Sequence, residues 1–200
     1  MRKQIAIALA ALSFGSAHAQ LGNGGGTYAG IERGEISAGQ FVEHYVGAAK
    51  QVLSAESGLL TAFGLTTDAQ NATAASHQLD APVTRGILED VLQRQADAAK
   101  ALQQKLAASQ PLQGDERAHF QQEVQALAQA LNASDALSKD LSANRKKLSA
   151  ARGADATQAV YLSKALPDHV RILQQTLEAA LAYARAQKIP VSQDIVATKE

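Results

Sequence analysis

Cysteine and tryptophan are absent from this 200-residue chain, and methionine occurs once, at the first position. Without cysteine there is no disulfide, thiolate nucleophile, cysteine-ligated zinc or iron–sulfur cluster. Without an internal methionine there is no thioether ligand for copper or haem. Only 4% of the residues are aromatic, and 19 basic residues balance 19 acidic ones. This composition lacks the basic, aromatic-rich stripe of a nucleic-acid-binding surface, so we expect no nucleic acid as a partner.

Alanine is abundant, at 42 of the 200 positions, and glutamine occurs 21 times. Both are strong helix formers, whereas the β-branched and aromatic residues that favour strands are scarce. The hydrophobic fraction is 46%, but so much of it is alanine that few large apolar side chains remain to build a core. We therefore predict one all-α domain with a thin core, an antiparallel four-helix-type bundle of four to five helices.

The first nineteen residues have the features of a secretory signal peptide. Arg2 and Lys3 give a basic start, residues 5–12 form a short apolar run, and residues 17–19 (Ala-His-Ala) fit the small-x-small pattern of a cleavage site. The apolar run is too short to span a bilayer, and no cysteine follows that could carry a lipid. We predict a signal peptide over residues 1–19 and an exported, soluble bacterial periplasmic product without membrane insertion; secretion outside the cell is the alternative.

The remaining chain divides by composition into a leader, a helical domain and a tail. Residues 20–36 are rich in glycine and poor in apolar residues, which predicts a flexible leader. Residues 37–190 carry the helical periodicity and should form the single bundle domain. Residues 191–200 are mostly polar and follow a proline, so we expect a loose tail.

The first half of the domain carries clear helix start and stop signals. Ser37 and Gln40 are spaced as a capping box, which predicts that the first long helix begins there and ends at Gly64. Residues 66–79 are polar, rich in alanine and weakly periodic, so they form either a short helix or an ordered loop. Residues 80–82 (Asp-Ala-Pro) predict the start of the next long helix.

The second half should contain two further long helices. The second long helix is expected to run to about Ser109, and the third to run from a cap at Asp115 to Gly153. The connection over residues 110–114 is short, which predicts that the helices on either side of it pack as an antiparallel hairpin. Pro167 either kinks the last helix or starts a new one.

Histidines are the sharpest candidates for a metal site. Beyond the signal peptide the chain has four, each on a different segment: His44, His77, His119 and His169. His119 and Glu123 are one helical turn apart, so both could reach one ion, with His44 and His169 as further candidate ligands. No paired or repeated ligand motif occurs, which favours scattered surface histidines instead. We therefore expect no metal or other cofactor and keep the metal site as an alternative.

A basic cluster lies towards the end of the third long helix, where Arg145, Lys146 and Lys147 are followed by Arg152. Cations near a helix C-terminus complement the helix dipole, which explains the cluster without a ligand. The alternative is an anion-binding patch for a lipid headgroup or a polymer. The four tyrosines could similarly line a ligand cleft, although three of them lie on or near apolar helix faces, which favours packing. They are Tyr28, Tyr45, Tyr161 and Tyr183.

No catalytic motif is present among the residues. The chain has no Gly-x-Ser-x-Gly elbow, Ser-x-x-Lys pair, His-Glu-x-x-His sequence or phosphate-binding glycine loop. We expect a protein that acts by binding or interaction, chaperone-like, as a scaffold or as an accessory of the bacterial envelope, with another envelope protein as its partner. The alternatives are a metal- or cofactor-binding bundle and an accessory component of an envelope secretion or conjugation system.

Overall fold

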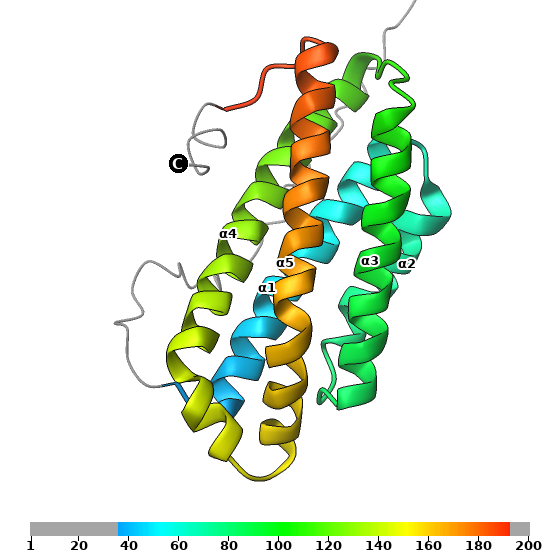
Figure 1. Cartoon of the computed structure of the whole chain (residues 1–200). Helices are drawn as coiled ribbons and strands as arrows, with labels where there is room; N and C mark the ends of the chain where they lie inside the picture. The colour runs from blue at the N-terminus through cyan, green and yellow to red at the C-terminus, as the bar shows by residue number, and fades with distance from the viewer. Residues whose placement is uncertain (1–35, 193–200) are drawn as a thin grey trace, which may run out of the picture. The chain divides into compact units, whose positions relative to one another are not determined.

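The computed structural model describes residues 36–192, and these residues belong to one compact unit. They form five α-helices and no strand, which confirms the predicted all-α bundle (Figure 1). The predicted signal peptide, nearly all of the leader, and residues 193–200 of the predicted tail lie outside the described residues. The helices are α1 (Ala38–Ala62), α2 (Thr66–Gln78), α3 (Arg85–Ala107), α4 (Gly114–Ala150) and α5 (Ala154–Ala186).

The start of α1 follows from the predicted capping box. The Ser37 hydroxyl accepts the Gln40 backbone N–H at 3.2 Å, and the Gln40 side chain accepts the Ser37 N–H at 2.9 Å. Two N–H groups that a helix start leaves without partners are thus satisfied. Ile36 falls within the predicted leader, but it is buried and its N–H donates to the Asn144 side chain. The bundle therefore begins one residue before the predicted boundary.

Two features of the following segment resolve or correct the sequence predictions. Residues 66–79 are almost entirely helical, because α2 packs its alanines against the bundle. The next helix, α3, begins at Arg85 and not at residues 80–82. The Thr84 hydroxyl accepts the Ile87 N–H at 3.3 Å, so Thr84, two residues after Pro82, caps α3.

The limits of the last two helices also differ from the prediction in detail. At the start of α4 the Glu116 side chain accepts the Gln113 N–H at 3.1 Å, so the N-cap is Gln113 and not Asp115. This helix ends at Ala150, and Gly153 instead precedes α5 with a φ of 101°, a conformation that favours glycine. Pro167 lies inside the unbroken α5 and starts no new helix.

Consecutive helices run in alternating directions, so α1, α3 and α5 are parallel and α4 runs against them (Figure 1). Two side-chain hydrogen bonds show that α3 and α5 are parallel. Near the start of both helices Gln158 donates to the Val83 carbonyl, and near the end of both helices Gln103 donates to the Thr176 hydroxyl. Helix α1 packs against all four others, and α5 packs against α1, α3 and α4.

The predicted hairpin of the helices that flank residues 110–114 is wrong. Helices α3 and α4 do not pack extensively against each other, because both place their apolar faces against α1 and α5. The connecting loop crosses the end of the bundle, where the Tyr183 hydroxyl donates to the Gln110 carbonyl and accepts the Leu112 N–H. At this end Tyr183 also packs edge-on against Phe63 and Phe120, with ring centroids 5.3 and 5.2 Å away.

Candidate functional site

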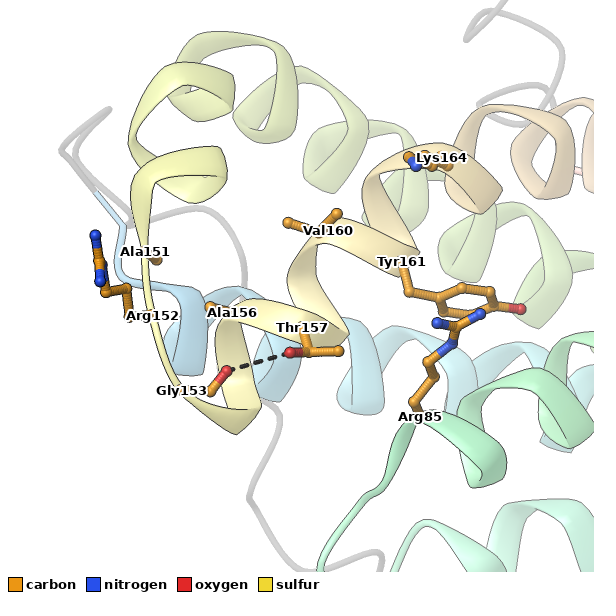
Figure 2. A pocket seen from close by; sticks show the side chains of 9 residues that line it. All are labelled: Arg85, Ala151, Arg152, Gly153, Ala156, Thr157, Val160, Tyr161 and Lys164. Carbon is orange, nitrogen blue, oxygen red and sulfur yellow. Dashed lines mark hydrogen bonds between the residues drawn. The ribbon is translucent and has the colours of Figure 1, made fainter.

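A surface cavity of about 460 Å³ lies at the end of the bundle where α4 turns into α5 (Figure 2). Its lining comes from the first turns of α5, the turn before them and the first residue of α3. We call it the basic pocket, because its charged lining residues are Arg85, Arg152 and Lys164, with no acidic residue among them.

The three cations come from separate elements and surround the basic pocket without meeting at one point (Figure 2). Arg85 lies over the ring of Tyr161, with its guanidinium carbon 5.3 Å from the ring centroid, and donates to Glu89 at 2.8 Å. Within residues 36–192, Arg152 and Lys164 form no ion pair. Both charges are therefore available to an anionic ligand.

An apolar surface completes the basic pocket. Ala156 is buried and Tyr161 is half-buried, while Val160 is 37% exposed. Among the described residues, Val160 is the large hydrophobic residue whose side chain is left exposed. The site can therefore hold an anionic group beside an apolar one.

A smaller cavity of about 260 Å³ follows along α5, and Tyr161 lines both cavities. We call it the acidic pocket, because its lining includes Glu89 and Asp168 and neither lysine nor arginine. His169 also lines it and is 5% exposed, so the prediction of a surface histidine is wrong at this position. Burial lowers the pKa of His169 to about 4, so its ring is neutral at neutral pH.

The predicted pair His119 and Glu123 is brought together by α4, with Nδ1 3.8 Å from Oε1. Glu123 packs over Gly58 of α1, where an added Cβ would clash with the Glu123 carboxyl group. This burial raises the pKa of Glu123, and the charge of His119 opposes the shift. Among the described residues, no three histidine or acidic side chains gather in a way that could hold a metal ion.

The two further candidate ligands lie far from this pair. His44 is fourteen positions before Gly58 on α1, which is about 21 Å along the helix. Arg117 donates to the Gln187 carbonyl, so the start of α4 lies beside the end of α5. From there Glu123 is six positions along α4 and His169 is eighteen positions back along α5, so they lie about twelve positions, or about 18 Å, apart along the bundle. The fold therefore does not bring His44 and His169 into one site with the pair.

Of the predicted basic cluster, only Arg152 lines the basic pocket. Arg145, Lys146 and Lys147 are exposed in the last turns of α4. The predicted cluster does not include Arg85 or Lys164. Arg85 reaches the pocket because α3 packs on α5, and Lys164 lies further along α5 itself. Tyr161, which the sequence analysis favoured as a packing residue, is the aromatic residue shared by both pockets.

No protein-family model, curated protein or solved structure matches this chain. The protein is a helical bundle with a basic, partly apolar pocket at one end. Within residues 36–192, no helix combines the length and the hydropathy that a membrane span requires.

Proposed function

We propose that this protein is exported to the bacterial periplasm and acts there by binding an anionic partner, as an accessory or chaperone-like protein of the envelope. The observation that carries this proposal is the basic pocket, in which Arg85, Arg152 and Lys164 surround the apolar surface around Tyr161. Anionic groups would pair with these cations, and apolar groups of the partner would cover Val160.

Binding fits the lining of the basic pocket better than catalysis. Its one hydroxyl group apart from Tyr161 belongs to Thr157, which donates to the Gly153 carbonyl, and no carboxylate or histidine lines the cavity to act as a base. Separated, exposed cations each contribute little, but together they attract a partner with several negative charges. A role in a secretion or conjugation system would use the same binding surface, so it is contained in this proposal.

The experiment measures binding of fluorescein-labelled poly-L-glutamate by fluorescence anisotropy, at low salt and near physiological salt. The variant Arg152→Glu/Lys164→Glu reverses two charges of the basic pocket. The control Lys100→Glu/Lys188→Glu makes the same change in net charge at exposed positions towards the opposite end of the bundle.

We expect the pocket variant to weaken binding about tenfold or more, because a few charge contacts of about 0.2–1 kcal/mol each are reversed and not merely removed. The control should weaken it about threefold or less, and salt should weaken the wild type. Equal losses in the two variants would show that only net charge matters, and this would overturn the proposal.

A further inference from the structure

Positive charge is concentrated where α4 turns into α5, in residues 145–164, which we call the basic hairpin (Figure 1). It contains five basic residues and one acidic residue, whereas the rest of residues 36–192 contains ten basic and fourteen acidic residues. The acidic residue, Asp155, lies beside Gly39 of α1. The described residues therefore have no net formal charge, but one end of the bundle is positive and the remainder is negative.

Four cations of the basic hairpin are exposed and form no ion pair within the described residues: Arg145, Lys146, Arg152 and Lys164. Arg145 and Lys146 lie outside the basic pocket, so the positive surface is larger than the pocket.

The spacing of these cations decides which kind of anion they can bind. Lys164 is ten positions after Ala154, the first residue of α5, which is about 15 Å along the helix from the turn that carries Arg152. Charges are screened over about 8 Å at physiological salt. A single phosphate or carboxylate would therefore meet only one or two of the cations, whereas an extended anionic surface would meet all of them.

An apolar side chain lies within the same surface. Val160 is 37% exposed and Lys164 is exposed one turn later, so both lie on the outward face of α5 (Figure 2). An anionic bilayer offers phosphate groups for the cations and, directly beneath them, an apolar layer for Val160. A soluble acidic polymer offers the charges without that layer.

We infer that the basic hairpin docks this protein on the surface of a bilayer that contains anionic phospholipids. The inference rests on the proposed function, and it names the anionic partner. Each lysine or arginine near such a surface strengthens binding about fivefold, so several weak contacts together hold the protein reversibly. The excess of acidic residues in the rest of the bundle turns the basic hairpin towards the bilayer.

The first experiment uses the absence of tryptophan from the chain. Val160→Trp places a single fluorescent reporter at the proposed contact, and Gln121→Trp is the matched control at an exposed position near the start of α4, towards the other end of the bundle. Both proteins begin at Gln20, so they lack the apolar run of the predicted signal peptide. They are titrated with vesicles of phosphatidylcholine alone and of phosphatidylcholine with phosphatidylglycerol in about equal parts.

We expect the emission of Val160→Trp to shift to shorter wavelengths with the anionic vesicles and to stay unchanged with the neutral ones. Tryptophan is favoured at the membrane–water interface, and its surroundings there are less polar than water. The emission of Gln121→Trp should stay unchanged with both kinds of vesicle, because that end of the bundle faces away from the bilayer.

The second experiment measures sedimentation of the protein with the same anionic vesicles. Arg145→Gln/Lys146→Gln removes two cations that lie outside the basic pocket, and it should weaken binding about tenfold. The control Lys100→Gln/Lys188→Gln removes the same charge at exposed positions elsewhere and should weaken binding about twofold or less. Inorganic phosphate, added at constant ionic strength, should not release the protein, because one anion replaces few of the contacts.

Four results would overturn the inference: no binding to anionic vesicles, equal binding to neutral ones, equal losses in the two charge variants, or equal emission shifts at the two tryptophan positions. Release by inorganic phosphate would do so as well, because the site would then hold a single anion. If poly-L-glutamate still binds through Arg152 and Lys164 in any of these cases, the proposed function stands and its partner is a soluble anion. Loss of binding to both vesicles and poly-L-glutamate would overturn the proposed function too.

Discussion

Replacing Glu56 by glutamine should stabilise the protein increasingly as the pH rises. Glu56 lies on the buried face of α1 and is fully inaccessible, and neither carboxyl oxygen has a hydrogen-bond partner within the described residues. Burial raises the pKa of this carboxyl well above its ordinary value of 4.5, because the charged form would lose its hydration without gaining a partner. The folded protein therefore keeps Glu56 protonated where the unfolded chain has ionised it.

The sign and size of the effect follow from linkage. Between the unfolded and folded pKa values the folded state holds one more proton, so the free energy of unfolding falls by about 1.4 kcal/mol for each pH unit. The contribution is fully present below a pH of about 4.5 and is lost as the pH rises through the folded pKa. Glu56→Gln removes this titration, so the difference in free energy of unfolding between variant and wild type should grow by the same amount per pH unit.

Urea unfolding followed by circular dichroism at about pH 5.5, 6.5 and 7.5 measures this difference directly. Titrations of other groups cancel in it, because they are shared by both proteins. Glu43→Gln, at an exposed position of the same helix, is the matched control for removal of one carboxyl group. A difference between Glu56→Gln and wild type that stays constant over this pH range would refute the reasoning, since the buried carboxyl would then hold no extra proton.

Three further predictions concern the core, the metal alternative and the N-terminus. Leu127→Ala should cost about 2–5 kcal/mol of unfolding free energy and Gln121→Ala about 0.5 kcal/mol or less, because Leu127 is fully buried and Gln121 is exposed; equal losses in urea melts would contradict this. Saturating zinc, copper or iron should leave the Tm unchanged. A metal site would instead raise the free energy of unfolding by about 2.7 kcal/mol at a hundredfold excess of metal over Kd, and both His119→Ala and Glu123→Ala would abolish this gain. Intact-mass analysis of the exported protein should find Gln20 as its first residue, and an uncleaved chain or a lipid adduct would show that the signal peptide is misassigned.

The sequence alone determined the fold class and part of the local structure of this protein, because caps and periodicity act over a few residues. The capping box of Ser37 and Gln40 predicts the start of α1 to the residue. The composition rich in alanine and glutamine predicts an all-α fold without reference to any tertiary contact. The start of α3 was missed by a few residues, because the Asp80–Pro82 signal and the Thr84 hydroxyl compete as caps and the hydroxyl forms the hydrogen bond.

Only the tertiary structure decided which helices are neighbours and which charges share a site. A short loop after α3 predicts a hairpin with α4, but burial of both apolar faces against α1 and α5 keeps the two helices apart. Arg85 and Lys164 meet at one pocket because α3 packs along α5, and no pattern in the sequence encodes that pairing. Likewise, Glu56 looks like an ordinary helical glutamate until packing from neighbouring helices removes it from water. Such contacts join residues distant in sequence, whereas caps and periodicity report only on a single helix.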